Sequence, residues 1–320
     1  VDRQCGSSQQ ALHFAAQAVM SGTQDVVIAG GVEVMSLVPI GASVKDGYDA
    51  GHGFPFNAKG IEDRYPGVFF SQFTGAELVA EKWNLSRNDL DKFALESHKK
   101  AAHATSEGYF DREIVPIESR SDSLETSILS NDEGIRYDAS LEALSGLKTV
   151  SDGGVITAGN ASQITDGASA VMVCNEKGLS KIKNDPRAEI ISLSVVGDDP
   201  VFMLTGPIPA TKLVLKTANL TIDDMDLYEV NEAFAPVPMA WSQELNADLN
   251  KLNVNGGAIA LGHPLGATGT KLMTTLIHEL ERRNGTYALQ AICEGGGTAN
   301  ATIIKTVSYT HLTLPTILLV

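Results

Sequence analysis

Two of the three cysteines stand in settings where a thiol can do chemistry. Cys5 lies in Gln-Cys-Gly-Ser-Ser directly before a helical pattern, so its sulfur is expected at a helix N-terminus, where the helix dipole favours a thiolate nucleophile. Cys293 precedes Glu-Gly-Gly-Gly, whose glycines let the backbone approach a ligand and present N–H groups to an anion. Cys174, in Val-Met-Val-Cys, is predicted to fill the core. Position alone leaves a buried structural role open for Cys5, because cysteine is among the most buried residue types.

A histidine and an asparagine add groups suited to moving a proton or holding an oxyanion. His263 lies in Gly-His-Pro-Leu-Gly-Ala-Thr-Gly, an open strand-to-helix turn, and an ordinary turn histidine is the alternative. The other six histidines are interpreted as surface or core residues. Asn231, in Asn-Glu-Ala-Phe-Ala, follows a strand-like segment over 227–230. Its uncharged amide can orient a water molecule or donate to an oxyanion, and the alternative is a helix N-cap.

The two cysteines belong to segments that share one plan. Residues 5–35 and 262–304 each begin with a turn of small residues, continue into an amphipathic helix, and then form an apolar strand followed by glycines. The first of these strands is expected to end at Gly30-Gly31. The repetition predicts an internal duplication of a strand-helix-strand layer. It therefore predicts an α/β fold, with ligand sites on loops at strand ends and helix N-termini.

Between these repeats the pattern changes. Glycine, aspartate, tyrosine and proline cluster at 41–67, one helical pattern runs over 75–108, and a polar loop is predicted at 118–140. This part is interpreted as an inserted, mostly helical excursion. The chain then returns to α/β patterning, predicted as strands over 168–174 and 188–196 and a helix over 208–218.

Composition and charge exclude several classes of protein. The chain has 320 residues, of which 43% are hydrophobic and 20% charged, as in soluble globular proteins. Its 24 basic and 39 acidic residues give a formal charge of −15, which repels nucleic acid and anionic membranes. No run of 18 apolar residues is present to span a bilayer. Three cysteines without a CxxC pair or metal-ligand spacing, and no targeting signal, favour a reducing, cytoplasmic location and no metal site.

Four blocks in chain order carry a resemblance to a known family. They are Cys5-Gly-Ser, Asn231-Glu-Ala-Phe-Ala, Gly262-His-Pro-x-Gly-x-x-Gly and Cys293-x-Gly-Gly-Gly. Further blocks extend the similarity over nearly the whole chain, namely Ser97-His-x-Lys-Ala, Thr157-Ala-Gly-Asn-Ala-Ser, Asp166-Gly-Ala and Gly206-Pro-Ile-Pro-Ala. The chain resembles the thiolases, which are acyl-CoA acyltransferases.

The resemblance implies a fold and a division of the chain. The fold would be α/β, a duplicated, layered α-β-α-β-α arrangement with an inserted helical loop domain. Residues 1–34 and 165–187 would be the remaining part of the N-terminal half, with the nucleophilic cysteine, and 35–164 the inserted loop domain that binds CoA. Residues 188–306 would be the C-terminal half, with the histidine and the second cysteine.

The resemblance also implies a role for each site residue. Cys5 would be the nucleophile that accepts the acyl group, and His263 would take its proton. Cys293 would be the second acid/base, acting on the carbon next to the thioester carbonyl, for which the thiol's ordinary pKa near neutrality is suitable. Asn231, through a water molecule, would join His263 in one oxyanion hole, and backbone N–H groups of Cys5 and Gly295 would form the other.

Coenzyme A would be a substrate rather than a tightly bound cofactor. The resemblance places its pantetheine arm along five residues: Ala158, Gly159, Ser162, Met203 and Phe234. Arg136 would lie near the nucleotide, where a locally basic mouth can hold phosphates on an acidic protein. The partners implied are acyl-CoA and CoA, with neither nucleic acid nor membrane, in a homodimer or homotetramer.

The chain departs from the family pattern in three places. The family has a further βα segment before the nucleophile, so we expect an N-terminally truncated chain. Ser71-Gln72-Phe73 replaces a block that lines the acyl pocket in many members, so the acyl chain length stays open. Residues 307–320, apolar and rich in threonine, are expected to be a non-native tail.

The leading hypothesis is a thiolase that cleaves 3-oxoacyl-CoA with CoA, or condenses two acyl-CoA molecules, through an acyl-cysteine. One alternative is a thiolase-like scaffold that binds CoA without turnover. Another is a decarboxylating ketoacyl synthase, which uses one cysteine and two histidines, and Cys293 at the second histidine's place argues against it. A cysteine hydrolase fits least, since no third polar group is marked to orient its base.

Overall fold

The molecule is built on a mixed β-sheet. The computed structural model describes residues 1–120, 126–182, 185–307 and 317–319. Within these residues, seven strands form the main sheet in the order β1-β4-β9-β5-β8-β7-β6. The β6–β7 pair is parallel and the other neighbouring pairs are antiparallel. The strands are β1 Val26–Val34, β4 Asp166–Cys174, β5 Ala188–Gly197, β6 Leu227–Val230, β7 Tyr287–Glu294, β8 Thr298–Thr306 and β9 Ile317–Leu319.

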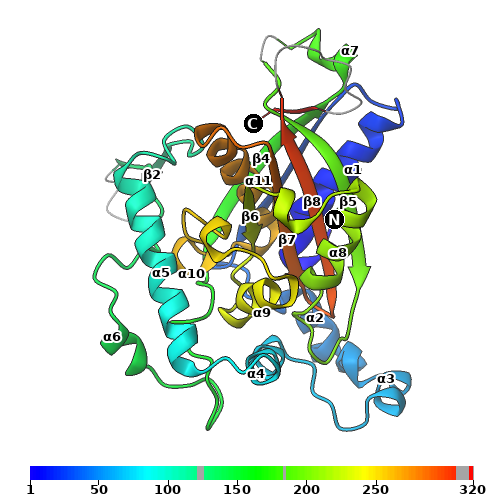
Figure 1. Ribbon diagram of the computed structural model, residues 1–320. Helices are drawn as coiled ribbons and strands as arrows, with labels where there is room; N and C mark the ends of the chain where they lie inside the picture. Colours follow the sequence, from blue (N-terminus) through cyan, green and yellow to red (C-terminus); the bar gives the residue numbers. More distant parts are fainter. Residues whose placement is uncertain (121–125, 183–184, 308–316, 320) are drawn as a thin grey trace.

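Helices cover the sheet in layers (Figure 1). The long helices α1 (Ser7–Met20) and α11 (Leu265–Arg282) pack against each other and bury their apolar stripes against β1, β4 and β7. Helices α8 (Pro207–Ala218) and α9 (Pro236–Leu245) cover the opposite face of β6, β7 and β8. Consecutive β7 residues point to opposite faces of the sheet. Ala288 therefore packs in the apolar cluster under α1 and α11, and Leu289 packs in the cluster under α8 and α9. The predicted α/β class is confirmed.

The first repeat has a longer strand than expected. A turn of 3-10 helix, η1 (Gln4–Gly6), leads into α1 and then β1. β1 does not end at Gly30, because Gly30 and Gly31 both pair with β4 and the ladder continues to Val34. One face of β1 stays open, with Ile28 68% and Val32 66% exposed.

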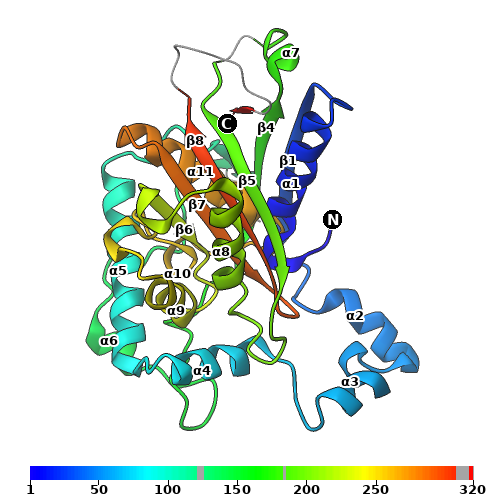
Figure 2. The same cartoon turned by 45° about the vertical axis from the view of Figure 1, so that its right-hand side comes forward.

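The inserted part is mostly helical, with two corrections to the sequence prediction. The single helical pattern over 75–108 is broken by Asn84, which has a φ of 54°, and a capping box of Ser86 and Asp89 starts the second helix. The loop predicted at 118–140 contains strands, because β2 pairs with β3. The bounds are α2 Ala42–Gly47, α3 Lys59–Arg64, α4 Gln72–Lys82, α5 Arg87–Ser106, β2 Ile117–Arg120, β3 Thr126–Leu129 and α6 Leu141–Ser145. Figure 2 shows α2 and α3 projecting from the sheet.

Short helices complete the chain. They are η2 Tyr48–His52, η3 Pro55–Asn57, α7 Glu176–Leu179, η4 Ile222–Asp224, η5 Leu249–Lys251 and α10 Ala258–Leu261. The prediction of a non-native tail falls largely on 308–316 and 320, which lie outside the described residues, while β9 lies between β4 and β5. No helix among the described residues has the length and apolar character needed to cross a membrane.

Candidate active site

β6 and β7 end side by side, which brings Asn231 and Cys293 to one edge of the sheet. The two strands are parallel neighbours, and the Asn231 backbone N–H donates to the Ala291 carbonyl at 3.1 Å. Asn231 is not a helix N-cap, because α9 begins at Pro236 with Ala235 before it. Parallel strands end at the same edge of a sheet, so Cys293, which is fully buried, lies close to Asn231.

The turn that carries Cys5 packs against the end of β7. We call residues Gln4–Gly6 the Cys5 turn. Cys5 is 8% exposed and packs with Leu272 of α11 and Ile292 of β7. A Cβ added at Gly295 would lie 3.0 Å from the Gln4 side-chain oxygen, so the glycine loop after β7 runs along this turn. The two thiols are close enough for charge on Cys5 to raise the pKa of Cys293.

His263 is held between Asn231 and Thr268. Its Nε2 lies 3.3 Å from Asn231 Nδ2 and its Nδ1 2.6 Å from Thr268 Oγ1. Thr268 Oγ1 donates its one proton to the Pro264 carbonyl at 2.9 Å, so it accepts from His263 Nδ1–H. Nε2 is therefore the unprotonated nitrogen, and the Asn231 amide donates to it. Burial lowers the pKa of His263 to about 4, so the ring is neutral and Nε2 can accept a proton.

Asn231 keeps one polar atom without a protein partner. Its Oδ1 is buried and makes no hydrogen bond within the described part of the chain. A buried amide oxygen in that state is a place for an ordered water or a substrate group.

Both thiols are protonated at rest, which corrects two expectations. Burial, with the carboxylate of Glu294 as the next cause, raises the pKa of Cys5 to about 12. The pKa of Cys293 lies well above its ordinary range, mainly because of burial and then because of Cys5. Desolvation thus outweighs the helix N-terminus at Cys5, and it removes the near-neutral pKa expected for Cys293. A base must take the proton from each thiol.

Two groups that hold this site were missed in the sequence. Thr268 fixes the His263 ring, and Glu232, which is 1% exposed, fixes the loop after β6. Glu232 accepts from Ser97 Oγ at 2.6 Å, from Asn253 Nδ2 at 2.9 Å and from the Ile259 backbone N–H at 3.2 Å. The signal that could have revealed Glu232 is its place in the block Asn231-Glu-Ala-Phe-Ala, two residues after the end of β6.

The residues expected around pantetheine partly converge. Met203 and Phe234 share one apolar cluster with Cys293, and the Ser162 backbone N–H donates to the Ala233 carbonyl at 3.0 Å. Ala158 is exposed and Gly159 half-buried on the same loop.

Arg136 lies further from that cluster. It is exposed, and its backbone N–H donates to His98 Nδ1 at 3.1 Å. Its neighbour Ile135 packs with α5 and α10. The link to the pantetheine residues is indirect: Gln163, next to Ser162, donates to the Gly134 carbonyl at 2.8 Å.

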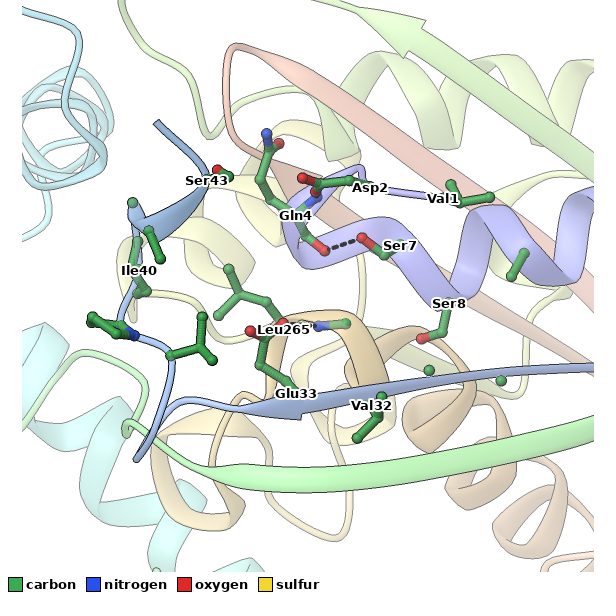
Figure 3. Close-up of a pocket in the computed structure, with 18 residues that line it drawn as sticks. Val1, Asp2, Gln4, Ser7, Ser8, Val32, Glu33, Ile40, Ser43 and Leu265 are labelled. Carbon is green, nitrogen blue, oxygen red and sulfur yellow. Dashed lines mark hydrogen bonds between the residues drawn. The ribbon is translucent and has the colours of Figure 1, made fainter. Parts of the chain in front are cut away.

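A cavity of about 430 Å³ adjoins the Cys5 turn from the other side. Figure 3 shows Gln4, Ser7 and Ser8 on one wall, Glu33 of β1 opposite, and Leu265 at the start of α11. None of Cys5, His263 and Cys293 lines it. The cavity therefore adjoins the site through Gln4 of the Cys5 turn.

Comparison with known proteins identifies the family to which the chain belongs. The family model for the thiolase N-terminal domain matches residues 1–177, and the model for the thiolase C-terminal domain matches residues 184–306. The chain belongs to the thiolase family. The steroid 3-ketoacyl-CoA thiolase FadA6 of Mycobacterium tuberculosis is 53% identical over 306 residues, which is 95% of this chain and 74% of that protein.

Another relative and a solved structure are similar to the chain over nearly its whole length. The cytosolic acetyl-CoA acetyltransferase of Rattus norvegicus is 41% identical over 94% of this chain and 77% of its own length. The human mitochondrial 3-ketoacyl-CoA thiolase in complex with CoA is 37% identical with a TM-score of 0.83, covering 96% of this chain and 77% of that chain. The chain has the α/β thiolase fold and is an acyl-CoA C-acyltransferase with acyl-CoA and CoA as substrates. These matches favour neither of the two alternatives, a CoA-binding scaffold without turnover and a decarboxylating ketoacyl synthase.

Proposed function

We propose that Cys5 carries the acyl group, His263 is its base, and Cys293 is the second acid/base. The observation that carries this proposal is that three parts of the chain pack together in one buried region. They are the Cys5 turn, the loop over 262–264 that carries His263 (the His263 loop), and the ends of β6 and β7. Asn231 and His263 would stabilise one oxyanion, and backbone N–H groups of Cys5 and Gly295 the other. The neutral ring and its unprotonated Nε2 support the base role of His263.

In the cleavage direction the proton transfers balance. His263 Nε2 takes the Cys5 proton as the Cys5 Sγ attacks the 3-oxo carbon of the substrate. The bond between C2 and C3 then breaks. Cys293 gives its proton to C2, which releases acetyl-CoA and leaves the acyl group on Cys5. The Cys293 thiolate then takes the thiol proton of incoming CoA, whose sulfur attacks the acyl-cysteine. Cys5 leaves and regains its proton from His263. Condensation is the reverse sequence.

Intact-protein mass spectrometry after incubation with acetoacetyl-CoA tests the nucleophile. We expect one acyl adduct that peptide mapping places on Cys5, its loss in Cys5→Ser, and its retention in the matched control Cys174→Ser. Cys174 is also a buried free thiol, but it lies at the end of β4 away from the site. An adduct that persists in Cys5→Ser would overturn the assignment.

We also propose that residues 35–164 supply much of the CoA site, with Ala158, Gly159, Ser162, Met203 and Phe234 along pantetheine and Arg136 at the nucleotide. The shared cluster of Met203, Phe234 and Cys293 supports the pantetheine part. Substituting Arg136 by Ala should raise KM for an acyl-CoA and leave KM for the matching acyl-pantetheine unchanged. An equal change for both substrates would remove Arg136 from the nucleotide site.

For the acyl group, we propose 3-oxoacyl-CoA substrates bulkier than acetoacetyl-CoA. The steroid-directed name of the relative at 53% identity supports this. The preference is measured as kcat/KM for a polycyclic or long-chain 3-oxoacyl-CoA divided by kcat/KM for acetoacetyl-CoA. A ratio below one would contradict the proposed preference for bulkier substrates.

The assembly and location are proposals of the same kind. The open apolar face of β1, with Ile28 and Val32 exposed, supports a homodimer or homotetramer, which light scattering would measure. Three free cysteines and the cytosolic name of the rat relative support the cytoplasm.

A further inference from the structure

A buried carboxylate lies near both site cysteines. Glu294 directly follows Cys293, and its side chain has no solvent exposure. Its Oε2 accepts from Arg3 Nε at 3.0 Å, from Arg3 Nη2 at 2.6 Å and from Thr298 Oγ1 at 2.7 Å. Arg3 is two residues before Cys5 and 291 residues from its partner. One ion pair therefore ties the segment leading to the Cys5 turn to the end of β7.

The second carboxylate oxygen presses against the Cys5 turn itself. A Cβ added at Gly6 would overlap Glu294 Oε1, Cδ and Cγ, so residue 6 must be glycine for the carboxylate to lie where it does. Arg3 and Gly6 flank Cys5 on both sides. The Glu294 side chain thus contacts the Arg3 side chain before the nucleophile and the Gly6 backbone after it.

The charge of this carboxylate acts on the thiols. Glu294 is a cause of the raised pKa of Cys5, second to burial and ahead of Glu33 of β1, and it also contributes to the raised pKa of Cys293. Burial raises the pKa of Glu294 itself, and the hydrogen bonds from Arg3 and Thr298 act in the opposite direction and favour the charged carboxylate. A negative charge at short range in a low-dielectric site disfavours a second one.

We propose that Glu294 is a positioning residue for acyl transfer: with Arg3 it fixes the Cys5 turn against the end of β7, and its charge opposes a thiolate at Cys5 before substrate binds. This rests on the proposed function in taking Cys5 as the nucleophile. The proton would then leave Cys5 only when His263 Nε2 is aligned to take it. A resting thiol is also protected from alkylation and oxidation.

Glu294→Gln tests the charge because it keeps the shape and an oxygen for Arg3. The pH dependence of iodoacetamide alkylation at Cys5, followed by peptide mass spectrometry, is the measurement. We expect the midpoint to move about one pH unit lower, which is roughly tenfold faster alkylation at a fixed pH below the midpoint. Glu281→Gln is the matched control, since Glu281 forms a comparable two-contact pair with Arg187 away from the cysteines. It should leave the midpoint unchanged.

Arg3→Lys tests the positioning, because lysine keeps the charge but loses the two-point contact. We expect kcat to fall roughly tenfold with KM within about twofold, and no downward shift of the alkylation midpoint. Glu294→Asp, which keeps the charge and withdraws it from Gly6, should likewise lower kcat and leave the midpoint high. These two variants give a result even if Glu294→Gln does not fold.

Two outcomes would overturn the proposal: an unchanged Cys5 midpoint in Glu294→Gln, or a wild-type kcat in both Arg3→Lys and Glu294→Asp. The alkylation readout does not require Cys5 to accept an acyl group. Loss of the proposed nucleophile role, seen as no acyl adduct on wild-type Cys5, is therefore distinguishable from failure of the Glu294 proposal.

Discussion

The hydroxyl of Thr268 sets which nitrogen of His263 is free to take a proton. Its hydrogen is committed to the Pro264 carbonyl, so the imidazole proton lies on Nδ1 and the reactive lone pair on Nε2. The neighbouring thiols are kept protonated by burial, and the imidazole is kept neutral by the same cause. The two thiols and the imidazole thus rest uncharged, and charge forms on the reacting groups only during the reaction, where oxyanion donors can stabilise it.

Cys293→Ala should separate the two half-reactions. The variant keeps Cys5 and His263, so acyl transfer from an acyl-CoA to Cys5 should continue, because the departing CoA sulfur can leave as a thiolate and take its proton from water instead of from Cys293. It lacks the group that moves the proton at the carbon next to the thioester carbonyl, so condensation and deuterium exchange at that carbon should fall by about 100-fold or more. Adduct formation by mass spectrometry and exchange by NMR are the two measurements. An equal loss of both would indicate a structural role for Cys293.

The crossing of α1 and α11 positions the site, because α1 follows the Cys5 turn and α11 follows the His263 loop. The two helices approach closely at Gly269, where an added Cβ would overlap the Gln9 backbone nitrogen. Neighbouring polar groups join the pair, since Ser8 Oγ accepts from the Thr270 backbone N–H at 3.0 Å. Backbone atoms cannot move aside as a flexible side chain can, so the crossing distance is fixed by glycine.

Gly269→Ala should therefore destabilise the protein and misalign the site together. We expect a loss of about 1–3 kcal/mol in the free energy of unfolding from overpacking, measured by urea denaturation, with a parallel fall in kcat. Gly60→Ala is the control, because Gly60 lies in α3 with no neighbouring atom within 4 Å of the added Cβ. It should leave stability unchanged or raise it by up to about 1 kcal/mol. Wild-type stability in Gly269→Ala would mean that the helices can separate.

Across the whole molecule, buried acids couple stability to pH. Glu229 in β6 is 3% exposed. Burial raises its pKa to about 8, with Lys271 and Lys100 lowering it and Glu232 and Glu113 raising it. Between the unfolded value of about 4.3 and the folded value, only the folded chain holds this proton. The protonated Glu229 therefore makes its full contribution to the free energy of unfolding at low pH, and this contribution is lost as the pH rises towards 8.

Glu229→Gln should remove this pH dependence. Relative to the variant, wild type should lose up to about 1.4 kcal/mol of unfolding free energy per pH unit between about pH 5.5 and about pH 7.5. Urea denaturation of both proteins at the two pH values measures the difference. Glu142→Gln, at an exposed position in α6, is the control and should keep the wild-type dependence. Parallel curves for wild type and Glu229→Gln would contradict the buried-proton account.

Local patterns in the chain were enough to predict the α/β class, the helices at α1 and α11, the strands at β4 to β7, and the family with its activity. These features depend on residues that are close in sequence: the apolar period of a helix, the alternation of strands and helices, and the contiguous blocks around Cys5, Asn231, His263 and Cys293. The roles of those four residues remain proposals with the tests given above.

The protonation of the site depends on distant parts of the chain that no local pattern reveals. The helix N-terminus at Cys5 does not lower the pKa of the thiol, because desolvation by the packed helices and the Glu294 charge exceed the helix dipole. The Arg3–Glu294 pair joins residues 291 apart, and Glu232 binds Ser97 across 135 residues. Burial and Coulomb energy depend on which groups the fold brings together, and that arrangement exists only once the two repeats have packed around α1 and α11.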